Sequence, residues 1–171
     1  MRKFRIPLAA LAAAMGPSVV SLFGTLLAIT PSSAADGRQW KLKLEPDYAR
    51  LAYDGGDQDG VISFSCTPGE GSVAVFVAVP DETKNAARVP IVLAAGGKEI
   101  RTRGEVENSV AETAMADTKL AASHPMLLAL SSEGVLRASA GGAKHEIAIT
   151  SAAANQAKQL LDACSKKPGR R

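Results

Sequence analysis

The chain has few aromatic residues: one Trp, two Tyr and four Phe among 171 residues. Those that follow residue 35 are Trp40, Tyr48, Tyr53, Phe64 and Phe76. They are not spaced along strands as the stacking platforms of single-stranded nucleic-acid binders are, which argues against nucleic acid as a partner. The hydrophobic core must therefore come mainly from Val, Ile, Leu, Met and Ala.

Residues that usually carry catalysis are also scarce. There are two histidines, His124 and His145, and no Gly-x-Ser-x-Gly motif, since residues 69–73 read Gly-Glu-Gly-Ser-Val. The glycine pairs at 55–56, 96–97 and 141–142 are isolated and do not form a phosphate loop before a helix. These absences favour a protein that is not an enzyme.

Charge is missing from residues 6–35, while Arg2, Lys3 and Arg5 precede that stretch. A basic start, an apolar middle and small residues at the end are typical of an export signal. Cleavage after Ala34 or after Ala35 fits, and the uncharged stretch is also long enough to remain as an uncleaved membrane anchor. We therefore expect a periplasmic or secreted protein with a signal peptide over residues 1–35.

The basic charge of the chain belongs to its two ends. Lys and Arg number 20 against 17 Asp and Glu, but three basic residues lie in the signal and four in the tail, residues 166–171. The body between them is acidic, which again argues against a nucleic-acid-binding domain. The basic tail is expected to be disordered and to touch anionic lipid weakly at most.

Only two cysteines are present, Cys66 and Cys164. In an oxidising compartment the simple expectation is one disulfide. Two distant thiols without a Cys-x-x-Cys motif do not suggest a metal site.

Alternating apolar and polar residues predict about eight strands. The expected strands are 40–44, 48–53, 61–66, 72–79, 89–95, 98–103, 135–140 and 144–150, while 104–120 could hold strands or a long connection. The segment 72–79, the most apolar of these, is expected to be central and covered on both faces. The fold class is thus mainly β, an antiparallel sandwich or open barrel, in a single domain over residues 36–165.

Two helices are expected late in the chain. A short one near 124–133 begins at Ser123-His124-Pro125, where a capping residue precedes Pro. The second, near 152–164, carries Ala157, Leu160, Leu161 and Cys164 on one stripe. This stripe should pack on the sheet and join the strand that ends at Cys66.

The turn at residues 54–60 is rich in aspartate. Asp57, Asp59 and Gly60 resemble the middle of an EF-hand loop, but Gly55 stands at its first position and Cys66 at its twelfth. Calcium could still be held by Asp54, Asp57 and Asp59. The simpler interpretation is a hairpin turn that uses Asp and Gly for their backbone preferences.

In layout the chain resembles a loosely defined group of small exported bacterial β-rich proteins of unknown function. They share a signal peptide, a first strand with Trp, a strand ending in Cys, a meander, a short helix and a last helix ending in Cys. The matching elements here are Trp40, Phe64-Ser65-Cys66 and Leu160-Leu161-Asp162-Ala163-Cys164. The resemblance implies a fold and a location, and no activity.

Three functions are compatible with these features. The first is a non-enzymatic envelope module that binds an envelope protein or cell-wall ligand through a sheet face, loops or an exposed edge such as Lys98 to Arg103. The second is a cell-wall hydrolase, or an inhibitor of one, with carboxylates facing each other across a pocket. The third is a calcium-dependent adhesion module. Membrane contact is expected only through an uncleaved N-terminal segment or the basic tail.

The calcium hypothesis predicts that added Ca²⁺ raises the melting temperature, because a ligand that binds only the folded state stabilises it. Thermal unfolding followed by circular dichroism over a calcium titration measures this. An unchanged melting temperature and unchanged spectra would remove the hypothesis.

Overall fold

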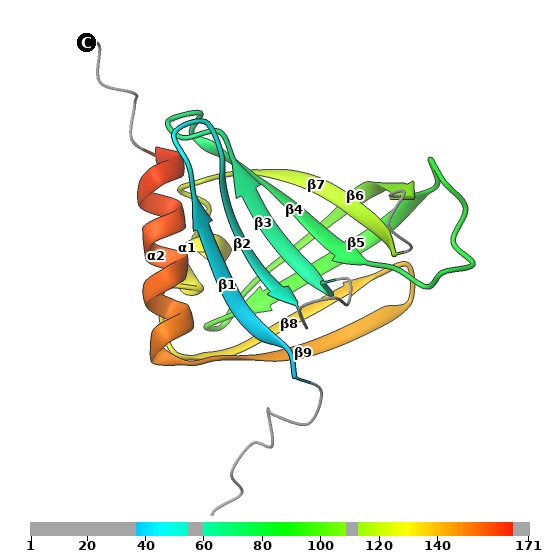
Figure 1. The fold of residues 1–171 in the computed structure, drawn as a ribbon. Coiled ribbons are helices and arrows are strands. Elements are labelled where there is room, and N and C mark those ends of the chain that lie inside the picture. Colours follow the sequence, from blue (N-terminus) through cyan, green and yellow to red (C-terminus); the bar gives the residue numbers. More distant parts are fainter. Residues whose placement is uncertain (1–36, 55–59, 109–112, 166–171) are drawn as a thin grey trace, which may run out of the picture. The chain divides into compact units, whose positions relative to one another are not determined.

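A computed structural model describes residues 37–54, 60–108 and 113–165 of the chain (Figure 1). The elements in chain order are β1 (Gln39–Leu44), β2 (Ala49–Asp54), β3 (Ile62–Cys66), β4 (Ser72–Ala78), β5 (Arg88–Ala95), β6 (Lys98–Asn108), β7 (Ala114–Ala121), α1 (Pro125–Ala129), β8 (Gly134–Ala140), β9 (Ala143–Ile149) and α2 (Ser151–Ser165). The predicted signal, residues 1–35, and the tail, 166–171, lie outside the described residues.

The described strands form one antiparallel sheet in the order β1-β2-β3-β4-β7-β6-β5-β8-β9. The sheet curls into a half-barrel, so the open-barrel prediction is confirmed (Figure 1). The undecided stretch 104–120 holds the end of β6, which runs on to Asn108, and most of β7, which lies between β4 and β6. Three of the eight residues of β7 are alanines, which are depleted in strands, so the local strand signal is weak.

The two faces of the curled sheet differ in polarity. Along β4, Val73, Val75 and Val77 are fully buried on the inner face. Ser72, Ala74 and Phe76 are only half-buried on the outer face, so the prediction that this strand is covered on both faces is wrong. Buried and partly exposed residues alternate in this way along a strand of a sheet that has one face on the core and the other face in solvent.

Helix α2 covers the inner face and packs on β1, β2, β4, β9 and α1 (Figure 1). Its buried side chains are Ala153, Ala154, Ala157, Leu160, Leu161 and Cys164. The helix is one residue longer at each end than predicted, and Thr150 Oγ1 accepts a hydrogen bond from Ala153 N at its start. The stripe predicted from the sequence is therefore the one that packs on the sheet.

The short helix is confirmed in position but is shorter than predicted. It spans Pro125–Ala129, and Leu130 to Glu133 form turns that lead into β8. Its N-cap is His124, whose Nδ1 accepts a hydrogen bond from Met126 N at 3.2 Å. Met126 and Leu127 are buried, so this one-turn helix fills the core beside β5 and β6.

The predicted Cys66–Cys164 disulfide is confirmed and joins the end of β3 to the end of α2. The same end of the helix is capped by a distant loop. Gly69 N donates to Ala163 O and Gly71 N donates to Cys164 O, both at 2.9 Å. Carbonyls that a helix end leaves unsatisfied are thus paired by the turn between β3 and β4.

The two edge strands of the sheet meet at one point. The indole Nε1 of Trp40 in β1 donates to the carbonyl oxygen of Ala148 in β9 at 3.0 Å. The Trp40 ring also contacts Tyr53 and Phe64, with ring centroids 5.4 and 6.4 Å away. This aromatic cluster therefore fixes the first strand against the last.

Replacing both cysteines by serine should lower the free energy of unfolding. The cysteines are 98 residues apart, and the chain-entropy model gives about 4–5 kcal/mol for a loop of that size, with about 2–5 kcal/mol usually measured. Urea denaturation of the oxidised wild type and the double variant measures the difference. The reduced wild type is the matched control and should resemble the variant; equal stability of all three would contradict the expectation.

Trp40→Phe should cost about 1 kcal/mol or more, because it keeps an aromatic ring but leaves the Ala148 carbonyl without its donor. Urea denaturation again measures the change. Tyr48→Phe is the control, since Tyr48 is 37% exposed before β2 and should change stability little. A Trp40→Phe variant as stable as the control would mean that the indole bond does not join the edges.

Candidate functional site

The outer face of β5, β6, β8 and β9 carries rows of charged side chains around small ones. Strand register places side chains from the four strands side by side in two rows. The first row is Glu99, Ala94, Arg137 and Glu146, and the second is Arg101, Val92, Ser139 and Lys144. The first row therefore has the small Ala94 between the longer Glu99 and Arg137, and the second row has Val92 and the short Ser139 between Arg101 and Lys144.

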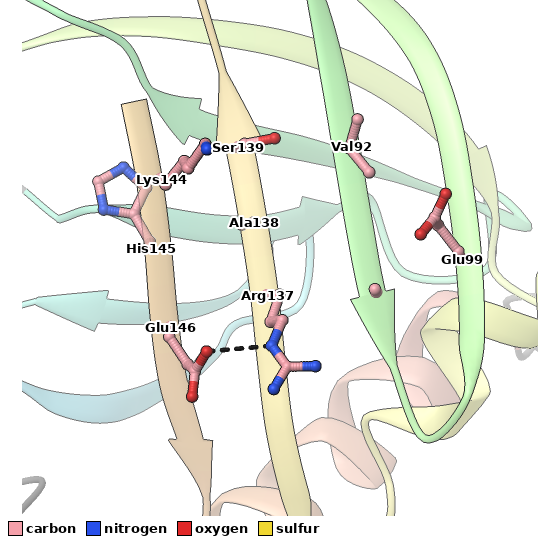
Figure 2. Close-up of a pocket in the computed structure, with 9 residues that line it drawn as sticks. Val92, Glu99, Arg137, Ala138, Ser139, Lys144, His145 and Glu146 are labelled. Atoms are coloured by element: carbon pink, nitrogen blue, oxygen red, sulfur yellow. Dashed lines mark hydrogen bonds and ion pairs between the residues drawn. The ribbon is translucent and has the colours of Figure 1, made fainter. Parts of the chain in front are cut away.

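This arrangement leaves a hollow of about 320 Å³ on the outer face, which we call the outer hollow. Its lining residues are Val92, Ala94, Glu99, Arg137, Ala138, Ser139, Lys144, His145 and Glu146. Figure 2 shows Glu99 on one flank, Val92 between, and Arg137 with Glu146 on the other flank. The floor is thus small and largely apolar, while the rim carries both signs of charge.

The charges of the rim are exposed and partly paired. Arg137 Nε lies 3.0 Å from Glu146 Oε2, and Arg101 Nε lies 2.6 Å from Glu99 Oε1. The four side chains are 47–76% exposed, so each pair adds little stability and can exchange partners with a ligand. No ion pair of Lys144 is found among the described residues, which leaves its ammonium open to a ligand.

A second hollow, of about 410 Å³, lies on the outer face of the other half of the sheet. Its lining residues are Tyr48, Arg50, Gly60, Ser63, Ser65, Phe76, Thr113 and Met115. Gly60 and Thr113 adjoin segments outside the described residues. Of these two hollows on the outer face, the outer hollow on β5, β8 and β9 is the one bounded by described residues throughout, and its rim carries both signs of charge, so we take it as the candidate site.

The predicted calcium ligands do not form a described site. Asp54 ends β2 and forms an ion pair with Lys41 of β1 at 2.5 Å. Asp57 and Asp59 lie outside the described residues. Within residues 37–54, 60–108 and 113–165, no group of three or more His, Cys, Asp or Glu side chains could hold a metal.

Both histidines contact the backbone. His124 caps α1, and His145 Nε2 lies 3.4 Å from the carbonyl oxygen of Ala78 at the end of β4. His145 alternates with Lys144 and Glu146 along β9, so its side chain faces inward while theirs face outward. Figure 2 shows the imidazole turned away from Val92 and Glu99.

The docking edge expected at Lys98 to Arg103 lies in β6, which is interior in the strand order, but this part of β6 pairs with a strand on one side only. β6 has β5 on one side and β7 on the other. Its register with β7 covers only Glu105 to Asn108, whereas β5 pairs along Lys98 to Glu105. Among the described residues no strand pairs with Lys98 to Arg103 on the side of β7, so this segment is an open edge in addition to the terminal strands β1 and β9.

The outer hollow could have been found in part from the sequence. The two-residue turn at Gly141–Gly142 fixes the β8–β9 register and sets Arg137 opposite Glu146. Pairing of β5 with β8, strands separated by more than thirty residues of chain, has no local signal. The floor contributed by Val92 and Ala94 was therefore missed.

No protein-family model, curated protein or solved structure matches this chain. The strand-to-helix disulfide fits the layout of the exported group described above, but only at that level. Among the described helices, none has the length and apolar character needed to cross a membrane.

Proposed function

We propose that the protein is an exported module of the cell envelope that binds a partner through the outer hollow and performs no chemistry on it. Two features support the location. Disulfides are typical of oxidising compartments, and the basic and apolar N-terminal residues have the pattern of an export signal. The proposed location is the periplasm or the cell exterior.

The observation that carries the binding proposal is the composition of the outer hollow. An apolar floor with a rim of both charges suits a ligand that has apolar groups and charges of both signs, as an extended protein segment does. Arg137 offers its guanidinium for a carboxylate, and Lys144 adds a second cation. The occupant we favour is therefore a segment of another envelope protein.

Hydrolysis of a cell-wall polymer is less well supported. Two carboxylates, Glu99 and Glu146, flank the outer hollow, but each is paired with an arginine. Their side chains are 47% and 64% exposed, while a general acid needs burial or a neighbouring like charge to raise its pKa. This geometry favours binding.

Arg137→Glu tests the proposal, because it reverses the central cation of the rim. Its matched control is Lys119→Glu on the outer face of β7, which also reverses an exposed, ion-paired cation. The Lys119 ammonium donates a hydrogen bond to Glu70, which lowers the pKa of that carboxyl, and it lies outside the outer hollow.

The tagged, disulfide-intact protein is used to capture partners from an envelope extract, and it is also co-sedimented with purified cell-wall sacculi. Arg137→Glu should weaken retention of an envelope protein roughly tenfold, the loss of one charge-assisted contact. Lys119→Glu should retain it. Equal retention by both variants would contradict the role of the hollow, and retention on sacculi alone would favour the cell-wall ligand.

A further inference from the structure

The strand β9 ends the sheet and has a neighbour, β8, on one side only. Such an edge presents backbone groups that can pair with another strand. The direction of these groups follows from the β8–β9 turn. Gly141 and Gly142 both have positive φ, +57° and +103°, as a two-residue hairpin turn of the favoured kind requires.

Ala140 and Ala143 close this hairpin and are therefore a hydrogen-bonded pair. Bonded and non-bonded pairs alternate in an antiparallel ladder, so the N–H and C=O groups of Lys144, Glu146 and Ala148 point away from β8. The hydrogen bond from Trp40 Nε1 to Ala148 O independently supports this assignment, because it reaches β9 from the side opposite β8.

The free stretch of the edge is short and symmetric about one residue. The turn limits it at one end, and Trp40 occupies the carbonyl of Ala148 at the other end. Ala143 to Ile147 remain, with His145 at the centre. Lys144 and Glu146 flank that centre with outward side chains.

We propose that two copies of this chain associate through their β9 strands, paired antiparallel about a two-fold axis at His145. This pairing sets Lys144 opposite Glu146 of the partner subunit, and the reverse, so each contact occurs twice. Both residues have backbone groups facing the partner, so each opposed pair exchanges two hydrogen bonds. The inference does not depend on the proposed function.

Charge selects this register. Sliding one strand by two residues would set Lys144 against Lys144, or Glu146 against Glu146, of the partner subunit, and like charges directly opposite are destabilising. Only the pairing centred on His145 joins opposite charges. Arg137 stays bonded to Glu146 on the same outer face and does not occupy the edge.

The other terminal strand, β1, carries charges that oppose self-pairing. Antiparallel self-pairing of β1 about Leu42 would set Lys41 against Lys43, two cations that share the outer face. Lysines placed in this way protect an edge from association. Of the two terminal strands of the sheet, β9 has charges complementary to those of a second copy and β1 does not.

Charge-reversal variants test the pairing by sedimentation velocity, from micromolar to millimolar protein. The wild type should dimerise as concentration rises. Lys144→Glu and Glu146→Lys should each weaken dimerisation roughly tenfold or more, because both attractive pairs become repulsive. Lys119→Glu, on the same face but away from the edge, should dimerise like the wild type.

Mixing the two variants separates the proposal from a general loss of folding. An equimolar mixture of Lys144→Glu and Glu146→Lys restores both opposite-charge pairs and should form a heterodimer, and the double exchange K144E/E146K should dimerise by itself. A wild type that remains monomeric throughout, single variants that dimerise like the wild type, or a mixture that stays monomeric would each overturn the proposal.

Discussion

The packing of α2 on the concave face is the contact on which the rest of the structure depends. The apolar face of a curled sheet must be shielded from water, and here α2 covers most of that face. The helix is held at its C-terminal end by the Cys66–Cys164 disulfide and by two backbone bonds from the β3–β4 turn. Near its N-terminal end, the Trp40–Ala148 bond joins the strands on which it rests.

Because the inner face and α2 supply the core, the outer face is free to carry other residues. Core positions such as Phe64, Ile91 and Leu136 are fully buried, whereas the outer positions of the same strands hold serine, arginine or small residues. A hollow can form there without cost to the core, since Val92, Ala94 and Ser139 are shorter than the charged side chains around them. The ion pairs around it are exposed and contribute little to stability, which suits a surface used for recognition.

Local patterns allowed most of the elements to be predicted. Three of these patterns depend only on residues that are close together in the chain: the alternation in Trp40–Leu44, the Gly-Gly turns and the apolar stripe of the last helix. The structure confirms the strands and the helix that they predict. The disulfide was predictable because only two cysteines exist. The position of β7 between β4 and β6, and the pairing of β5 with β8, depend on contacts between distant segments, so no local pattern could predict them.

The strand order also determines whether a strand with outward charges is an edge that can pair with another chain. Trp40–Leu44 and Ala143–Ile149 both alternate outward charges with inward apolar or aromatic residues, and in sequence they look equivalent. The fold makes both of them edges. Lys41 and Lys43 then repel a second copy, whereas Lys144 and Glu146 complement one, because a two-fold axis places residues at equal distances from the centre opposite each other. The same alternation therefore protects one edge and equips the other for pairing, and the difference is the sign of a single charge.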